Sequence, residues 1–266
     1  MELIQLIILS IVQGITEFLP VSSSAHLILV PLLTNWQDQG LAIDVAAHLG
    51  SLVAVVFYFR KDISRILLAG FDSIAKRSID TADSKLFWYL AIASIPVLIA
   101  GFLFRDIVSI YLRDPLIIAA ASIGFGLLLW YSDISSKCNK QIDHLNLRDA
   151  IVIGCAQALA LVPGTSRSGI TMTAGLLLGL DRISAARFSF LMAVPIIIAA
   201  AGYESYKLLQ MGEAVAVTNF IFTTILSAVS ALLAIHLFLK FLEKIGMLPF
   251  VIYRIVLGLI LVVMFV

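Results

Sequence analysis

Two short stretches of the chain place polar and ionisable side chains inside otherwise apolar sequence. The first runs from Gln13 to His26 and contains Glu17, Pro20 and a run of serines. Gln13 and Glu17 are four residues apart, so on a helix they share one face. An amide oxygen beside a carboxylate offers the hard oxygen donors that Mg²⁺ or Ca²⁺ prefers. The spacing therefore favours a cation site at Gln13 and Glu17.

The serine run follows the proline and could supply a nucleophile. Ser23 and His26 are three residues apart and share a helical face, which brings a hydroxyl within reach of an imidazole that could activate it. The alternative is that the serines only cap the following helix and that His26 only packs or forms a hydrogen bond. Glu17 has no such simple alternative, because burying an unpaired carboxylate is costly.

The second stretch, from Pro163 to Thr171, offers donors for an anion. Gly164 allows close approach of the backbone, and a helix N-terminus with free amides is expected directly after it. Arg167 adds a planar guanidinium that matches phosphate oxygens, and hydroxyl donors stand at Ser166, Ser168 and Thr171. The alternative is that Arg167 only pairs with Glu17 as a structural ion pair. Together the two stretches fit phosphoryl chemistry, in which catalysis is positioning and charge neutralisation.

The rest of the chain is too apolar for a soluble protein. Of its 266 residues, 61% are hydrophobic and 13% are charged, whereas ordinary soluble domains have about 25% charged residues. The balance of 18 Lys and Arg against 17 Asp and Glu argues against a nucleic-acid partner, which selects a basic face. Cys138 and Cys155 give no disulfide framework, and we expect no removable signal peptide. The composition predicts an integral membrane protein.

Six apolar stretches come close to the length of about 20 residues that a membrane-spanning helix needs. They are Leu41–Phe59, Leu86–Phe104, Leu116–Tyr131, Phe188–Ser205, Thr218–Leu239 and Phe250–Val266. Two further apolar regions, Leu3–Leu33 and Ala150–Leu180, carry the polar stretches in their middle. As a single helix each would be about 46 Å long, too long for a hydrocarbon core of about 30 Å. We therefore predict two re-entrant hairpins whose irregular backbone is covered by protein or by a water-filled cavity.

The predicted fold class is an all-α polytopic membrane protein with a single membrane domain. Residues 1–131 and 149–266 form two repeats, each a re-entrant hairpin plus three spans, and residues 132–148 link them. Three is an odd number, so the second repeat lies upside down relative to the first. Each break also has a glutamine shortly before its proline, Gln13 and Gln157. An inverted repeat places its site at the repeat interface near the membrane midplane, where the two breaks should face each other.

Loop charges predict the orientation. The loops expected on one side carry most lysines and arginines: 60–85, 132–148, 181–187 and 240–249. The loops expected on the other side carry Arg105, Arg113 and Lys207. The positive-inside rule makes the richer side cytoplasmic. The first hairpin then enters from outside and the second from the cytoplasm.

The remaining ionisable residues in apolar sequence carry weaker expectations. Asp44 and His48 are four residues apart near the start of a span, and they could reach the site or simply face a vestibule. Glu204, His236 and Arg254 are expected to be interfacial or snorkelling groups.

In its two polar stretches the chain resembles the undecaprenyl-diphosphate phosphatases, the bacitracin-resistance family of bacterial membrane proteins. The family's Glu/Gln-x-x-x-Glu pattern stands here as Gln13 and Glu17 and runs on to His26. Its Pro-Gly-x-Ser-Arg-Ser-x-x-Thr pattern stands at residues 163–171, and the likeness extends to the closing pair Tyr253–Arg254. One departure is Gln13 in place of a glutamate, which removes one negative charge from the cation site.

The resemblance implies an activity and a location. It implies hydrolysis of undecaprenyl diphosphate to undecaprenyl phosphate and inorganic phosphate, with help from a divalent cation, Mg²⁺ or Ca²⁺. The reaction would recycle the lipid carrier for cell-wall synthesis and confer bacitracin resistance. The protein would lie in the bacterial plasma (inner) membrane with its site open to the periplasmic side. Its partners would be the polyprenyl diphosphate lipid and the membrane, and a homodimer is a candidate assembly.

The resemblance also implies residue roles. The catalytic residues would be Glu17, Ser23, His26 and Arg167, and Gln13 would join Glu17 in holding the cation. The diphosphate would be held by Ser22, Ser24, Gly164, Ser166, Ser168 and Thr171. The nucleophile stays open between Ser23, His26 and a water held by Glu17. A secondary transporter or polyprenyl-phosphate flippase is the alternative function, because inverted repeats with broken helices are usual in alternating-access carriers.

Overall fold

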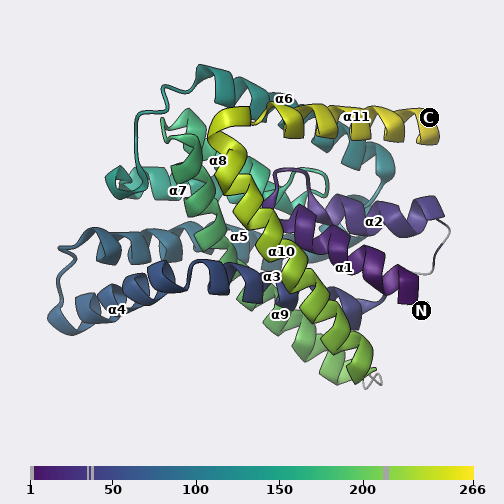
Figure 1. Ribbon diagram of the computed structural model, residues 1–266, viewed down its shortest axis with the longest axis horizontal. Coiled ribbons are helices and arrows are strands. Elements are labelled where there is room, and N and C mark those ends of the chain that lie inside the picture. The colour runs from purple at the N-terminus through teal and green to yellow at the C-terminus, as the bar shows by residue number, and fades with distance from the viewer. Residues whose placement is uncertain (1–2, 35, 37–38, 212–215) are drawn as a thin grey trace.

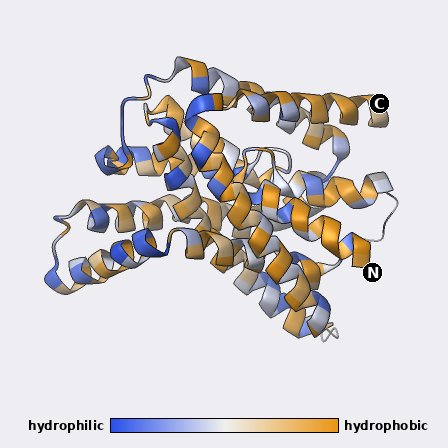
Figure 2. Cartoon of the chain, in the orientation of Figure 1, coloured by the Kyte–Doolittle hydropathy of each residue, from blue (hydrophilic) through white to orange (hydrophobic). Residues whose placement is uncertain are grey.

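The computed structural model describes residues 3–34, 36, 39–211 and 216–266 and is helical through most of them. Six helices in these ranges are long and apolar enough to cross a membrane. They are α3 (Leu41–Tyr58), α5 (Ala82–Tyr111), α6 (Pro115–Ser135), α9 (Arg182–Met211), α10 (Val217–Ile245) and α11 (Leu248–Phe265), shown in Figure 1. Hydrophobic residues dominate α10 and α11 in Figure 2. The six predicted spans and the multi-pass membrane class are confirmed.

The two remaining apolar regions are each broken into short helices, as predicted. The first gives α1 (Leu3–Phe18) and α2 (Ser23–Thr34). The second gives α7 (Leu147–Ala158), the single turn η2 (Leu159–Leu161) and α8 (Arg167–Leu177). None of these helices exceeds 16 residues, or about 24 Å, so none crosses a hydrocarbon core alone. Within each region the two helices pack against each other, which fits a hairpin.

The predicted loop 60–85 is wrong for most of its length. It forms the helix α4 (Arg60–Lys76), which lies along the start of α5 at the left of Figure 1. The reason is an apolar stripe among its charges. Gly70 abuts the Phe87 ring, and Trp88 Nε1 donates to Ser73 Oγ at 3.0 Å. Counting charges alone missed this amphipathic pattern.

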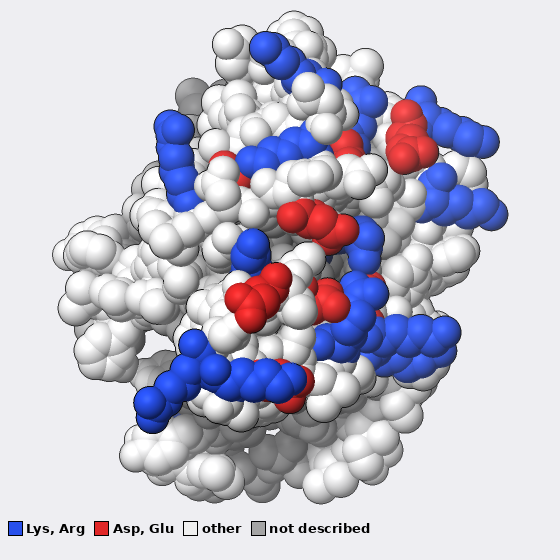
Figure 3. Space-filling view, turned by 90° about the vertical axis from the view of Figure 1, so that its left-hand side faces the viewer, with Lys and Arg blue, Asp and Glu red and all other residues white. Residues whose placement is uncertain are grey.

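The charged end of the molecule lies around α4. Figure 3 looks at this end and shows lysines and arginines gathered there together with acidic side chains. The predicted loops 181–187 and 240–249 are largely helical, because α9 begins at Arg182 and α10 continues to Ile245. The short turn η1 (Ile142–His144) forms in the linker. Arg105, expected in a loop on the opposite side, falls within α5.

Helix pairing runs across the two halves in a reciprocal way. α1 of the first half packs on α10, the second span of the other half, and α7 packs on α5, the second span of the first half. The first spans α3 and α9 contact each other, as do the third spans α6 and α11. This exchange of partners is what a twofold relation between halves would give. The inverted repeat and its boundaries stay predictions.

Glycines allow the closest of these contacts. A Cβ on Gly50 of α3 would lie 2.3 Å from the Thr224 carbonyl oxygen of α10, and one on Gly14 of α1 would lie 2.5 Å from the Ser227 carbonyl oxygen. Because α3 and α10 lie this close together, Ser227 Oγ of α10 donates to the Ala47 carbonyl of α3 at 2.7 Å. Small residues at interfaces allow such interhelical hydrogen bonds within membranes. α10 therefore packs tightly against both α3 and α1.

We predict that Gly50→Ala destabilises the protein, because the added methyl group forces α3 and α10 apart at a cost of about 1–3 kcal/mol. The thermal unfolding midpoint in detergent measures this. The matched control is Gly202→Ala in α9, where a Cβ would meet nothing within 4 Å. That change should leave the midpoint unchanged or raise it slightly, since alanine is about 1 kcal/mol better than glycine in a helix. Equal midpoints for both variants would contradict the close contact.

Candidate active site

The tips of the two breaks touch. The Gly164 backbone N–H of the second break donates to Ser22 Oγ of the first at 3.2 Å. Ser168 Oγ, at the start of α8, donates to the Leu19 carbonyl at 2.8 Å. These bonds pair polar groups of two loops that neither α1 nor α8 can satisfy alone. The expectation that the breaks face each other is confirmed.

An ion pair joins the two breaks at their centre. Arg167 Nη2 lies 2.8 Å from Glu17 Oε1, and the two side chains are 14% and 8% exposed. Arg167 Nη1 donates to the Ser189 carbonyl of α9 at 3.1 Å, and the guanidinium lies 5.8 Å from the centre of the Phe18 ring. The Glu17 carboxylate of the first break and the Arg167 guanidinium of the second are therefore in direct contact.

Glu17 accepts three side-chain hydrogen bonds from both breaks. Its Oε2 accepts hydrogen bonds from Ser23 Oγ at 2.7 Å and from Gln13 Nε2 at 2.9 Å, while Oε1 accepts from Arg167. The Gln13–Glu17 pair follows from their spacing on α1. The Ser23–Glu17 bond forms because the chain turns between α1 and α2, which brings the first residue of α2 back to the end of α1.

The predicted pairing of Ser23 with His26 is wrong. Within the described chain no hydrogen bond joins them, because His26 turns toward other partners. Its Nδ1 lies 2.7 Å from the Ser22 carbonyl, and its Nε2 lies 2.5 Å from the Tyr253 hydroxyl of α11. A carbonyl only accepts, so Nδ1 carries the proton and Nε2 accepts from Tyr253. Helical spacing alone did not give the partner of either side chain.

Strained backbone marks both breaks. Ser22 has φ 74° and Ser166 has φ 70°, in a region that residues other than glycine rarely adopt. Such strain persists where the surroundings enforce it, as they do at functional sites. Here Ser22 Oγ accepts from Gly164, and Ser166 Oγ accepts from the Gly169 N–H at 3.1 Å, which caps α8.

The other predicted phosphate-binding residues differ in exposure and in hydrogen bonding. Ser24 is exposed on α2, and its Oγ lies 3.2 Å from Ser22 Oγ. Thr171 is buried and its hydroxyl is bonded to Ser189 Oγ at 2.7 Å and to the Arg167 carbonyl at 2.8 Å. Ser168 is committed to Leu19. Thr171 and Ser168 therefore fix α8 against its neighbours.

Two side chains of α11 belong to the site although the sequence did not place them there. Arg254 was expected to snorkel, but it is 1% exposed and its Nη2 donates to the carbonyls of Gly164 and Thr165 at 2.9 and 2.8 Å. Tyr253 bonds to His26. A cation in the middle of an apolar span signals a site, and that signal was available in the sequence.

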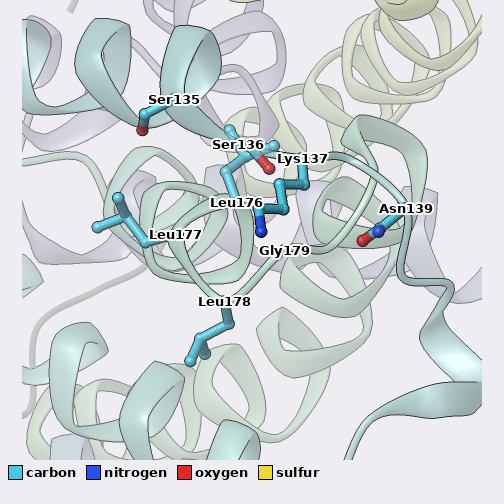
Figure 4. A pocket seen from close by; sticks show the side chains of 8 residues that line it. All are labelled: Ser135, Ser136, Lys137, Asn139, Leu176, Leu177, Leu178 and Gly179. Carbon is cyan, nitrogen blue, oxygen red and sulfur yellow. The ribbon is translucent and has the colours of Figure 1, made fainter.

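One further ionisable side chain lies near the breaks, and two hollows lie apart from them. His48 of α3 is close enough to Glu17 for their charges to interact, and its Nδ1 is bonded to the Asp44 carbonyl of its own helix at 2.8 Å. Exposed His236 lines an apolar hollow between α3 and α10. A pocket of about 320 Å³ lies between the end of α6 and the end of α8, with Lys137 among its lining residues (Figure 4). That pocket shares no residue with the two breaks.

The donor set can contribute to a cation site but cannot complete one. Gln13 Oε1 is buried and has no hydrogen-bond partner, and the Nε2 of the same amide donates to Glu17 Oε2 at 2.9 Å. Among the described residues no group of three or more His, Cys, Asp or Glu could hold a metal ion. A hard cation bound here would need further oxygen ligands from a substrate.

The arrangement combines three chemical abilities. A carboxylate that accepts a hydrogen bond from a serine hydroxyl can take its proton. A guanidinium beside that carboxylate can bind an anionic oxygen. The capped start of α8 adds the positive end of a helix dipole.

Comparison with known proteins gives consistent matches over nearly the whole chain. The family model for bacitracin resistance protein BacA matches residues 6–260. Undecaprenyl-diphosphatase 2 of Stutzerimonas stutzeri is 56% identical over 268 aligned positions, covering 100% of this chain and 99% of that protein. Undecaprenyl-diphosphatase 1 of Pseudoalteromonas translucida is 52% identical, with 97% of each chain covered. The undecaprenyl-diphosphatase of Thioalkalivibrio sulfidiphilus is 51% identical, with 100% of each covered.

Proposed function

Because the chain belongs to the bacitracin resistance protein BacA family, we propose how its two breaks carry out the reaction for which its relatives are named. The protein is a membrane-embedded undecaprenyl-diphosphatase that hydrolyses undecaprenyl diphosphate to undecaprenyl phosphate and inorganic phosphate. The phosphatase is favoured over the transporter or flippase alternative. The observation that carries the proposal is the buried Glu17 carboxylate, bonded at once to Arg167 and to Ser23.

In the proposed mechanism Ser23 is the nucleophile and Glu17 its base. Ser23 Oγ attacks the terminal phosphorus, its proton passes to Glu17 Oε2, and the bond from phosphorus to the bridging oxygen breaks to release undecaprenyl phosphate. Water then attacks the phosphoserine, which releases inorganic phosphate and returns the proton to Ser23. Support comes from the 2.7 Å Ser23–Glu17 bond and from His26 being engaged by Ser22 and Tyr253.

Arg167 and the start of α8 hold the phosphate charge in this proposal. Two Arg167 nitrogens bond to Glu17 and to the Ser189 carbonyl, and the guanidinium carries further N–H groups for phosphate oxygens. Gly164 and Ser166 shape the turn that presents the N-terminus of α8. Positioning and charge neutralisation are the main requirements of phosphoryl transfer.

We propose that a divalent cation, Mg²⁺ or Ca²⁺, is held by Gln13 and Glu17 with the substrate's phosphate oxygens. The unpartnered Gln13 Oε1 supports this. When bound, such an ion neutralises phosphate charge as a Lewis acid.

The site is proposed to open to the periplasmic side of the bacterial inner membrane. The gathering of lysines and arginines at the α4 end (Figure 3) supports this orientation, because that end would be cytoplasmic. Hydrolysis there would recycle the lipid carrier for cell-wall synthesis and give bacitracin resistance. The breaks, α9 and α11 of one chain supply every group named above, so the proposed chemistry does not require a homodimer.

We predict that Glu17→Ala and Arg167→Ala each lower phosphate release from undecaprenyl diphosphate by roughly 100-fold or more, because each removes a charge that acts at the reacting phosphate. Initial rates in detergent measure this. Arg182→Ala is the matched control, because it breaks the partly buried Arg182–Asp133 pair at 2.6 Å, away from both breaks. Near wild-type turnover in a Glu17 or Arg167 variant would contradict the site. If a variant unfolds, Glu17→Gln and Arg167→Lys carry the test.

Ser23→Ala should abolish a covalent intermediate. A single turnover with substrate labelled on its terminal phosphate, quenched by acid, should leave label on wild-type Ser23 and none on the variant. Ser24→Ala, which removes the exposed neighbouring hydroxyl, should keep the label. Labelling that survives in Ser23→Ala would eliminate Ser23, and unlabelled but active Ser23→Ala protein would assign the attack to water held by Glu17.

Chelation should stop the reaction, because the proposed cation neutralises phosphate charge. Phosphate release should fall after EDTA treatment and return when Mg²⁺ or Ca²⁺ is added. Gln13→Ala should raise the cation concentration needed for half-maximal activity, whereas Ser10→Ala, at a buried polar position on the same helix, should not. Full activity after exhaustive chelation would contradict the proposed role of the cation.

A further inference from the structure

Arg254 is the largest fully buried side chain that the mechanism above does not use. It lies in α11 and is 1% exposed. Its Nη2 donates to three backbone carbonyls, those of Ala121 at 3.4 Å, Gly164 at 2.9 Å and Thr165 at 2.8 Å. These hydrogen bonds connect α11 to the turn of the second break, which is far from α11 in sequence.

The charge of Arg254 is not balanced by the protein. No carboxylate of the described residues forms an ion pair with it, and its Nε and Nη1 are buried without hydrogen-bond partners. A buried charge is normally paired, because removing it from water costs several kcal/mol, on the order of the whole gain from a good ion pair. Within the described residues this charge therefore has backbone carbonyls as its hydrogen-bond partners and no anion.

The unpaired face of Arg254 lies against the start of α8. A Cβ on Gly169 would come within 2.9 Å of Nη1, so this nitrogen sits beside the first turn of the helix. The hydroxyl of Thr165, one residue before the N-cap Ser166, is also buried without a partner. The unpaired guanidinium nitrogen and the positive end of the α8 dipole thus both lie at the first turn of α8.

Charge balance at the two breaks points to an anionic ligand. Glu17 and Arg167 pair with each other, whereas no described carboxylate pairs with Arg254. A diphosphate brings several negative charges, which the Glu17–Arg167 pair alone cannot neutralise. Arg254 supplies the additional positive field without competing with Glu17.

We propose that Arg254 is a second guanidinium of the diphosphate site, a positioning residue that holds the turn from Gly164 to Ser166 and whose charge is balanced only when a diphosphate occupies the start of α8. This inference rests on the proposed function. The neighbouring Tyr253 strengthens it, because its hydroxyl bonds to His26. Two successive residues of α11 therefore hold one break each and set their relative position.

The test measures binding of inorganic pyrophosphate to the purified full chain in detergent, by calorimetry and by its effect on the unfolding midpoint. Arg254→Gln should weaken binding about tenfold or more, because it removes a charge-assisted interaction. Arg254→Lys keeps the charge and should recover part of the affinity. Arg182→Gln, which breaks a pair away from the breaks, should bind like wild type. In steady-state assays the KM of Arg254→Gln should rise more than its kcat falls.

The outcomes separate this inference from the proposed function. If Arg254→Gln lowers the unfolding midpoint but binds pyrophosphate as tightly as wild type, Arg254 is only structural and the inference fails. It fails too if wild-type protein releases phosphate yet binds no pyrophosphate. A wild-type chain that releases no phosphate from undecaprenyl diphosphate would instead overturn the proposed function. If Arg254→Gln does not fold, Arg254→Lys carries the test. Weaker pyrophosphate binding by Arg254→Lys than by wild type supports the inference. Wild-type affinity for pyrophosphate together with a lower unfolding midpoint overturns it.

Discussion

The structure depends on one requirement: polar groups buried in a membrane protein must find partners inside the protein. Glu17 shows how strictly it applies. Its carboxylate is 8% exposed and accepts hydrogen bonds from Arg167, Ser23 and Gln13. These donors come from α8, α2 and α1, so the carboxylate is satisfied only when both breaks are in place. The contacts that join the two breaks are therefore also contacts of the site.

The same requirement explains the tight packing around the breaks. Each broken helix leaves peptide groups unpaired at its end, and the tips satisfy them mutually through Ser22 to Gly164 and Ser168 to Leu19. Tips that meet at hydrogen-bond distance need their supporting helices to be fixed closely. The glycine contacts of α1 and α3 with α10 provide this, and Arg254 ties α11 to the second break.

Sequence patterns predicted the elements better than the partners. Apolar length gave the six spans, and polar interruptions gave both breaks, the Gln13–Glu17 pair and the meeting of Glu17 with Arg167. Spacing on a helix could not give the partner of His26, because that partner, Tyr253, lies on α11. The same limit hid Arg254, whose burial depends on where α11 packs. The helix α4 was missed for a different reason, since a high density of charge concealed its apolar stripe.

The ion pair also bears on how the site would respond to its substrate. In the resting structure Arg167 is shared between Glu17 and the Ser189 carbonyl, so part of its positive charge stabilises the carboxylate. Under the proposed mechanism an arriving phosphate would compete for the same guanidinium, and a carboxylate that loses a cationic partner becomes a stronger proton acceptor. Under the proposed mechanism, substrate binding would make Glu17 a better base for Ser23 at the moment when the phosphorus is in place. Under the same proposal the positive charge of Arg254 would attract the phosphate to the start of α8, and Arg254 has no contact with Ser23 or Glu17 among its hydrogen bonds.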